Sequence, residues 1–154
     1  MGFQLDLTTD SVQDAGPQEP LVVAPETSIR ETFQLLKKQA RGGVLVCRGD
    51  QLVGVFTERD ALRLMATGAD LDGPIHPVMS PQPVTVESTA SVADAIRIMS
   101  KCGHRRLPVI DDAGRPTGIL KVSAIVHYLV EYVPGAVYTL PPDPHPWTRD
   151  REGA

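Results

Sequence analysis

Apolar and polar residues follow two alternating periods along this chain, and the same order of periods occurs twice. Short apolar or β-branched runs stand at residues 21–23 and 84–86, and prolines that mark turns and sheet edges flank both. In the segment after each run, apolar residues recur every three or four positions, which is the spacing of one buried face of a helix. The pattern therefore predicts a short strand followed by a helix in each half of the chain.

Hydroxyl and carboxylate residues mark the start of both predicted helices. Ser28 is followed three residues later by Glu31, and Ser91 by Asp94, which is the spacing of a capping box. In this motif the two side chains satisfy backbone amides that the first helical turn leaves unpaired. We expect the helices to begin directly after these serines and to end near residues 40 and 101, ahead of glycines.

A hairpin and a second helix follow in each copy. Residues 44–47 and 52–56 are apolar runs joined by a polar loop that contains glycine, and a similar pair of runs flanks residues 111–115. The next helix is predicted to span residues 58–67 in the first copy. In the second copy it is predicted to begin near Ser123, which we expect to cap it.

The last predicted helix is apolar on almost all sides from residue 122 to 133, with Tyr128 and Tyr132 on its surface. Such a helix suits packing on two sides, as at an interface between two identical chains. The alternative is that the helix lies deeper in its own fold.

The two halves are copies of one unit. Ser28 and Ser91 stand 63 residues apart, and Gly54 and Gly118 stand 64 apart, so a single loop residue shifts the register. One unit of this size is too small to bury both of its faces, whereas two units can share a core. We therefore predict an α+β (mixed α/β) fold in which two pseudo-symmetric β-α-β-β-α repeats pack sheet to sheet. The predicted domains are an N-terminal extension (1–19), a first repeat (20–73), a second repeat (74–133) and a Pro-rich C-terminal tail (134–154).

The composition indicates a soluble module. The chain has 154 residues, of which 42% are hydrophobic and 22% are charged. No apolar stretch approaches the roughly 20 residues of a membrane-spanning helix, and the first residues lack a secretory signal. The net charge of −4 argues against general binding to nucleic acids. We expect a cytoplasmic location, with neither membrane nor nucleic acid as a partner.

The sequence offers little chemistry for catalysis or metal binding. Cys47 and Cys102 stand in apolar elements, where buried free thiols are expected rather than a disulfide. The histidines are scattered and neither cysteine has a second ligand nearby, which argues against a metal site. Since a phosphate-cradling loop and a nucleophile elbow are also missing, we expect that the protein is not an enzyme and requires no cofactor.

Two motifs at matching places in the repeat resemble a known family. Residues 54–60 read Gly-Val-Phe-Thr-Glu-Arg-Asp at the junction of hairpin and helix, and residues 106–111 read Arg-Leu-Pro-Val-Ile-Asp. Together with the repeated order of elements, these motifs are similar to a tandem pair of cystathionine beta-synthase (CBS) domains, the Bateman module. The resemblance covers nearly all of the part that we expect to fold.

The resemblance implies a regulatory module rather than a catalyst. Members of this family bind adenosine nucleotides such as AMP, ADP or ATP, sometimes S-adenosylmethionine, in a cleft shared by two domains, and the pairs commonly dimerise. It implies that Asp60 holds the ribose hydroxyls, while Thr57 and the neighbouring amides approach the ribose and the phosphates. The expected partners are an adenosine nucleotide, a second copy of the chain in a homodimer, and a separate effector protein.

Elementary chemistry supports these roles for Thr57 and Asp60. A single ionised carboxylate can accept hydrogen bonds from both hydroxyls of a ribose. The amino end of a helix offers unpaired amides and the positive end of a dipole to a phosphate, and Arg59 adds a positive charge beside it. The alternative is that Thr57 and Asp60 only cap the helix.

In the family, the second repeat completes this cleft, which implies contacts near Ala90 and residues 104–107, with the adenine ring against apolar side chains. Arg105 or Arg106 would then reach the phosphates, a task that suits the planar guanidinium. The alternatives are that these arginines stand at an exposed strand edge or pair with carboxylates of the following loop, and that the histidine before them is a surface residue. The candidate ligand-binding residues are Thr57, Arg59, Asp60, Ala90, His104, Arg105, Arg106 and Leu107.

The second repeat departs from the motif. Lys121 stands where the first repeat has Thr57, and Ala124 stands where it has Asp60. The second cleft therefore lacks the carboxylate that would recognise a ribose, although Lys121 could still hold a phosphate. We expect one competent site per chain.

Two functions from different classes remain open. The first is a sensor in which a bound adenosine nucleotide changes the angle between domains or subunits, and a partner responds to that change. The second is a ligand-free homodimerisation scaffold with vestigial clefts. For the Pro-rich tail, docking on a partner and an extended segment without a binding role both remain open.

Overall fold

The computed structural model describes residues 10–132. The predicted Pro-rich tail and the first nine residues of the predicted N-terminal extension lie outside these residues. The described part holds four α-helices, two short 3-10 helices and seven strands. In chain order they are η1 (Val12–Ala15), β1 (Val22–Val23), α1 (Ile29–Gln39), β2 (Gly43–Arg48), β3 (Gln51–Thr57), α2 (Glu58–Thr67), η2 (His76–Val78), β4 (Ser80–Pro81), β5 (Val86–Glu87), α3 (Val92–Cys102), β6 (Arg106–Ile110), β7 (Pro116–Lys121) and α4 (Val122–Tyr132).

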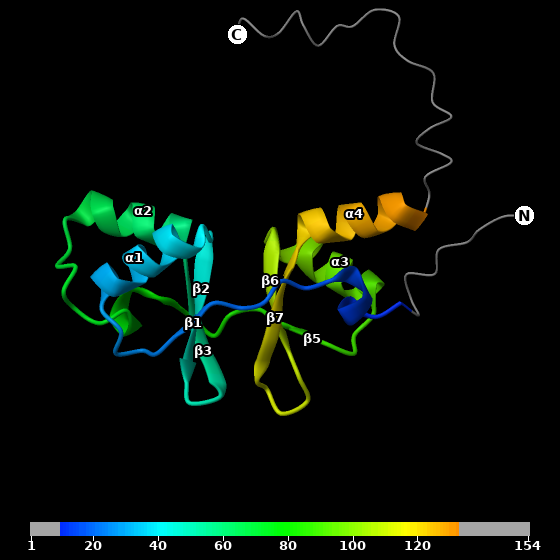
Figure 1. Cartoon of the computed structure of the whole chain (residues 1–154), viewed down its shortest axis with the longest axis horizontal. Coiled ribbons are helices and arrows are strands. Elements are labelled where there is room, and N and C mark those ends of the chain that lie inside the picture. The colour runs from blue at the N-terminus through cyan, green and yellow to red at the C-terminus, as the bar shows by residue number, and fades with distance from the viewer. Residues whose placement is uncertain (1–9, 133–154) are drawn as a thin grey trace, which may run out of the picture.

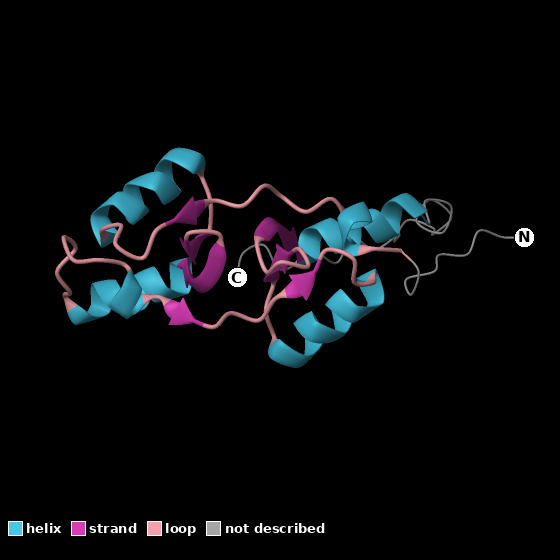
Figure 2. Cartoon of the chain, turned by 90° about the horizontal axis from the view of Figure 1, so that it is seen from below, coloured by secondary structure: helices cyan, strands magenta, loops and turns pink. Residues whose placement is uncertain are grey.

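The strands form two sheets, one for each repeat. The first has the order β1-β2-β3-β4 and the second has the order β5-β6-β7. In both, the leading strand runs parallel to the next one, and a hairpin supplies the antiparallel pair. Figure 1 shows the two hairpins side by side at the centre of the molecule, and Figure 2 shows the helices on the outer sides. The predicted α+β fold with two β-α-β-β-α repeats is therefore confirmed.

The predicted helix starts are present, but they differ in their caps. The hydroxyls of Ser28 and Ser91 each accept a hydrogen bond from the amide three residues later. Complete capping boxes stand at the starts of η1 and α2, and in α2 the box joins Thr57 and Asp60. The expected cap at Ser123 is wrong, because α4 already begins at Val122.

Each repeat contains its own hydrophobic core. Phe56 and Ile75 have no exposed surface and lie in the core of the first repeat. Leu107 and Leu120 have none either and lie in the core of the second. Because most of the core residues of each repeat come from its own sheet and α-helices, each sheet buries the face that its helices cover.

The two cores are completed by segments that cross between the repeats. Ahead of the first repeat in sequence, Val12 is fully buried in the second core, and its amide donates to Ala90 at 2.8 Å. Gln18 exchanges two backbone hydrogen bonds with Ile119 of β7, each of 2.8 Å. In the opposite direction, residues 75–81 pack on the first repeat, where β4 extends its sheet.

This exchange makes the repeats dependent on each other. A core that loses its crossing segment exposes both buried side chains and unpaired backbone groups of an edge strand. The domain boundary between residues 73 and 74 stays a prediction. In the structure, the segment before the first repeat contacts the second repeat, and residues 75–81, after the boundary, contact the first.

The last helix packs on its own repeat with one side only. Ile125 and Tyr128 are buried, whereas Val122, Val126 and Val130 are 38%, 51% and 44% exposed. These valines recur every four residues and so form one exposed stripe along α4. The alternative that the helix lies deep in its own fold is therefore wrong for the side that carries these valines, which its own repeat does not cover.

The crossing segment before the first repeat should contribute to global stability. We predict that Val12→Ala lowers the free energy of unfolding by about 1.5–3 kcal/mol, because a fully buried valine is truncated in a packed core. Val84→Ala, at a position that is 39% exposed, should change it by less than about 0.5 kcal/mol. Urea denaturation measures both values, and equal effects of the two substitutions would contradict the role of this segment.

Candidate functional site

Thr57 and Asp60 hold each other at the amino end of α2. The amide of Thr57 donates to Asp60 Oδ2 at 3.0 Å, and the Thr57 hydroxyl lies 3.2 Å from the same oxygen. The Asp60 amide in turn lies 3.5 Å from the Thr57 hydroxyl. Asp60 is only 9% exposed, so its carboxylate is fixed in a largely buried position by the start of its own helix.

A third residue, Ser80, also contacts this carboxylate. Its hydroxyl donates to Asp60 Oδ1 at 3.1 Å and lies 3.4 Å from Oδ2. Ser80 belongs to β4, in the connection between the two repeats, and pairs with Val55 of β3. Sequence reasoning missed Ser80, because no motif spacing links it to the helix that begins 22 residues earlier, at Glu58.

Arg106 brings the second repeat to the start of α2. A side-chain carbon added at Gly42 would lie 3.0 Å from both terminal guanidinium nitrogens of Arg106 and 2.8 Å from a carboxylate oxygen of Glu58. Gly42 also accepts a hydrogen bond from the Glu58 amide at 3.1 Å. The guanidinium of Arg106 therefore lies over the junction of β2 and α2, in the repeat opposite to its own.

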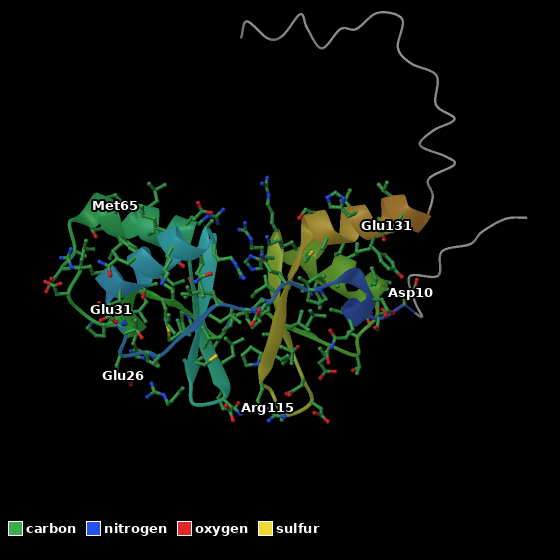
Figure 3. All side chains as sticks on the ribbon, in the orientation of Figure 1. Asp10, Glu26, Glu31, Met65, Arg115 and Glu131 are labelled. Atoms are coloured by element: carbon green, nitrogen blue, oxygen red, sulfur yellow. The ribbon has the colours of Figure 1, made fainter. Side chains whose placement is uncertain are left out.

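Further positive charge stands next to Arg106. Lys121 lies directly opposite Arg106 in the β6-β7 pair, so the two side chains share one face of the sheet. Within residues 10–132, neither makes an ion pair, and the same holds for Arg105 and for Arg59, an exposed residue in the first turn of α2. Like charges opposite each other are destabilising unless an anion lies between them. Figure 3 shows nitrogen-bearing side chains gathered between the repeats, where α2 and α4 begin.

The alternative for these arginines, an ion pair with a carboxylate of the following loop, is absent from the described residues. Asp111 instead binds Arg115 of its own loop. The backbone amide of Arg115 donates to Asp111 Oδ1 at 2.9 Å, and its side-chain Nε donates to Oδ2 at 3.0 Å. Arg105 is exposed, and its carbonyl accepts a hydrogen bond from the Val122 amide at 2.9 Å. Arg105 and Arg106 are thus available to a ligand.

The remaining candidates lie farther into the second repeat. His104 is exposed, whereas Leu107 is fully buried in the core. Ala90 is half-buried and lines a cavity of about 430 Å³ with residues of β5 and α3, including Asp94 and Arg97. This cavity does not include Thr57 or Asp60. The structure thus brings Arg106 to the α2 junction, but it places Ala90 and Leu107 within the second repeat.

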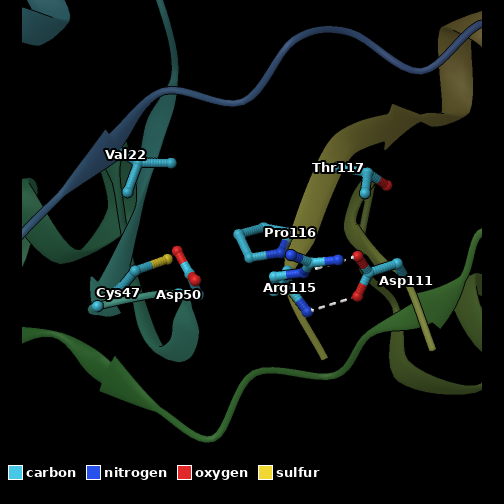
Figure 4. Close-up of a pocket in the computed structure, with 8 residues that line it drawn as sticks. Val22, Cys47, Asp50, Asp111, Arg115, Pro116 and Thr117 are labelled. Carbon is cyan, nitrogen blue, oxygen red and sulfur yellow. Dashed lines mark hydrogen bonds and ion pairs between the residues drawn. The ribbon is translucent and has the colours of Figure 1, made fainter. Parts of the chain in front are cut away.

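A different cavity, of about 350 Å³, lies between the two hairpins (Figure 4). The first repeat contributes Cys47 and Asp50, and the second contributes Asp111 and Arg115. The hairpin tips also touch, because the Gln51 side chain donates to the Ala113 carbonyl at 3.4 Å. Since Arg115 is already paired with Asp111 at 3.0 Å, this cavity does not present a free positive charge to an anionic ligand.

The cysteines show no features of a reactive site. Both are free, and Cys102 is exposed rather than buried as expected, because it ends α3. Burial raises the pKa of the Cys47 thiol, and the Asp50 carboxylate raises it further. At neutral pH this thiol therefore stays protonated and weakly nucleophilic. Among residues 10–132, no cluster of three or more His, Cys, Asp or Glu side chains is placed to hold a metal ion.

Comparison with known proteins defines the family. The sequence model of the CBS domain matches residues 12–67 and again 75–131. CBS domain-containing protein YhcV of Bacillus subtilis is 35% identical over 102 residues, which are 66% of this chain and 73% of that protein. The chain belongs to the CBS domain family, and its two copies form a tandem pair, as the sequence motifs predicted.

Solved structures support the same assignment. CBSX2, solved in complex with AMP, has a TM-score of 0.70 and 27% identity, over 79% of this chain and 97% of that one. The CBS domain protein PAE2072 from Pyrobaculum aerophilum, also complexed with AMP, has a TM-score of 0.71 and 27% identity, over 80% and 98%. Within residues 10–132, no helix has the length and apolar character that a membrane crossing requires.

Stability should depend on pH through Asp111. Hydrogen bonds from the Arg115 backbone, from Ala113 and from the Arg115 side chain hold the pKa of this carboxyl below its ordinary value of 3.8. The ionised form thus stabilises the fold at neutral pH, and this contribution is lost as the pH falls through the lowered pKa. We predict that Asp111→Asn is less stable than the wild type at pH 7 and that the difference shrinks below pH 3.8.

Urea denaturation between pH 7 and pH 3 measures this dependence. Asp112→Asn is the matched control, because it removes the neighbouring exposed carboxylate. A stability difference for Asp111→Asn that is constant over the whole pH range would contradict the prediction.

Proposed function

We propose that this protein is a regulatory module that binds an adenosine nucleotide of the AMP, ADP or ATP type at one site per chain. The observation that carries this proposal is the position of the Arg106 guanidinium from the second repeat over the Gly42–Glu58 junction where α2 begins. A phosphate at this point meets the amino end of α2 and a guanidinium together, which is a favourable arrangement for an anion.

Asp60 would supply recognition of the sugar. Its carboxylate is held three residues after Thr57, at the same helix end. A nucleotide with its phosphate near Arg106 would therefore carry its ribose toward this carboxylate, which accepts hydrogen bonds from hydroxyl groups. The AMP complexes of CBSX2 and of PAE2072, both similar to this chain along most of its length, support an adenosine ligand. S-adenosylmethionine remains a second ligand to test.

Regulation would follow from the shared position of the site. A ligand that contacts both α2 of the first repeat and Arg106 of the second favours one relative placement of the repeats. An effector that contacts both repeats would respond to that placement. Catalysis has no part in this proposal, because the site residues would bind and orient the nucleotide without a bond being made or broken.

The second cleft would not recognise a nucleoside. Lys121 and Ala124 replace Thr57 and Asp60 in the corresponding positions, so the carboxylate is missing. Lys121 also faces the same side as Arg106, and its charge would add to the phosphate-binding region. One recognition site per chain is therefore the number that we propose.

The alternative function is a ligand-free scaffold that dimerises. It is favoured by the capping box of Thr57 and Asp60, which by itself accounts for both residues as elements of helix stability. The exposed valine stripe of α4 fits either function, since a regulatory module can be a homodimer too.

Nucleotide titration separates the two functions. We predict that AMP, ADP or ATP raises the melting temperature of the nucleotide-free protein, because a ligand that binds only the folded state stabilises it by mass action. Asp60→Ala should weaken the affinity by about 10- to 100-fold, the range for hydrogen bonds to a charged group. Calorimetry gives the affinity and thermal shift gives the stabilisation.

Glu31→Ala is the matched control for this experiment. It removes an exposed carboxylate at the same position of the first turn, but in α1, and it should leave the affinity unchanged. Absence of a thermal shift with any of the nucleotides and with S-adenosylmethionine would leave the scaffold as the better explanation.

We also propose that the module is a homodimer that uses the valine stripe of α4. Figure 1 shows α2 and α4 along the same side of the molecule, and on α2 Leu62 and Met65 are 71% and 68% exposed. Together with the valine stripe of α4, these side chains leave apolar surface exposed on both helices. Exposed large apolar side chains gathered on one side are typical of an interface between protein chains.

Val126→Asp should shift the protein from dimer to monomer. An unpaired charge buried in an apolar interface costs more than about 1.4 kcal/mol, so the dimer dissociation constant should rise by more than about tenfold. Sedimentation or light scattering across a concentration series measures this change. His127→Asp, at the next and also exposed position, is the control, and an equal effect of both substitutions would argue against the stripe.

A further inference from the structure

The carboxylate of Asp60 has little capacity left for a ligand. A carboxylate offers about four acceptor positions on its two oxygens. The amide and hydroxyl of Thr57 both point to Oδ2, at 3.0 and 3.2 Å, and Ser80 occupies a position on Oδ1 at 3.1 Å. About one position remains, whereas the two hydroxyls of a ribose need two.

Ser80 is the contact that can be given up. The bond from the Thr57 amide belongs to the capping box of α2, and its loss would leave an amide at the start of that helix unpaired. The Thr57 hydroxyl is held beside the same oxygen because it also accepts from the Asp60 amide at 3.5 Å. The bond from Ser80 comes from outside the helix, from β4 in the connection between the repeats. Ser80 is half-buried, so its hydroxyl can turn away from Asp60 and exchange partners with water.

The backbone that carries Ser80 is held closely against β3. A side-chain carbon at Gly54 would lie 2.9 Å from two carbons of Met79, the residue before Ser80. Ser80 pairs with Val55, and the amide of Gln82 donates to Val53 at 3.3 Å. Because the backbone is fixed on both sides, the position of the Ser80 hydroxyl near Asp60 is a built feature of the ligand-free protein.

We propose that Ser80 acts as an internal competitor for the ribose and thereby sets how strongly the site distinguishes ribonucleotides from deoxyribonucleotides. This inference rests on the proposed nucleotide site at Asp60. A nucleotide with both ribose hydroxyls must displace the Ser80 hydroxyl before its second hydroxyl can bind. A 2′-deoxynucleotide has one fewer donor and fits the single free position while Ser80 stays in place.

The competition also gives the connection between the repeats a role in ligand binding. Ser80 is the residue of β4 that contacts the site directly, and β4 lies in the segment that joins the first repeat to the second. When a ribose takes its place, the side chain that links this segment to α2 changes its partner. Ligand binding therefore changes the contacts of the segment between the repeats first.

Ser80→Ala tests the proposal, with AMP and 2′-deoxy-AMP as probes in calorimetric titrations. The variant frees a second acceptor position on Asp60, so AMP should bind more tightly. The ratio of the 2′-deoxy-AMP to the AMP dissociation constant should rise by about three- to tenfold over the wild type, the gain expected for one hydrogen bond. A purely structural role of Ser80 would change both affinities alike and leave this ratio unchanged.

Ser88→Ala is the matched control, because this half-buried serine follows β5 in the second repeat, and its ratio should equal that of the wild type. An unchanged ratio in Ser80→Ala, or weaker binding of AMP, would overturn the competitor role while the nucleotide site itself stands. If the wild type binds neither probe and Asp60→Ala makes no difference, the proposed function fails and this inference fails with it.

Discussion

The exchange of segments between the two repeats is the constraint on which the rest of the structure depends. Val12 enters the second core from the start of the chain, and Ile75 enters the first core from beyond that repeat. Neither core is complete without the segment that crosses to it, so the repeats must fold against each other. This arrangement fixes the start of β6 next to the start of α2, which no contact within one repeat could do.

Small residues in one repeat leave room for large charged residues of the other. Gly42 and Gly43 stand at the positions that Arg105 and Arg106 occupy in the second repeat, and the guanidinium of Arg106 fills the space beside Gly42. If both repeats had arginines at these positions, the four cations would repel each other. If both had glycines, the region would carry no positive charge. The pseudo-symmetric fold therefore carries an asymmetric site, with the cations of one repeat at the helix start of the other.

The sequence predicts the features that depend on local rules. The hairpins, the helices and the cap of α2 by Thr57 and Asp60 follow from periodicity and from the needs of unpaired amides. Contacts between residues far apart in the sequence leave no such pattern, which is why the sequence did not predict the backbone bridge from Gln18 to Ile119 or the side-chain bond from Ser80 to Asp60. The exposed side of α4 likewise could not be predicted from the sequence, because the helix is apolar on almost all sides and the pattern does not show which side packs on its own repeat.

The surroundings of α2 and α4 differ in more than the carboxylate. β4 places Ser80 opposite Val55, and the crossing segment before the first repeat places Gln18 opposite Ile119, the equivalent residue of β7. At the equivalent positions, the second repeat thus has Ala124 in place of Asp60, and Gln18 stands in place of Ser80. A carboxylate that served only as a helix cap would need no hydroxyl from the segment between the repeats. The carboxylate and the hydroxyl are present together in the first repeat and replaced together in the second, which favours a shared role for them in the ligand binding that we propose.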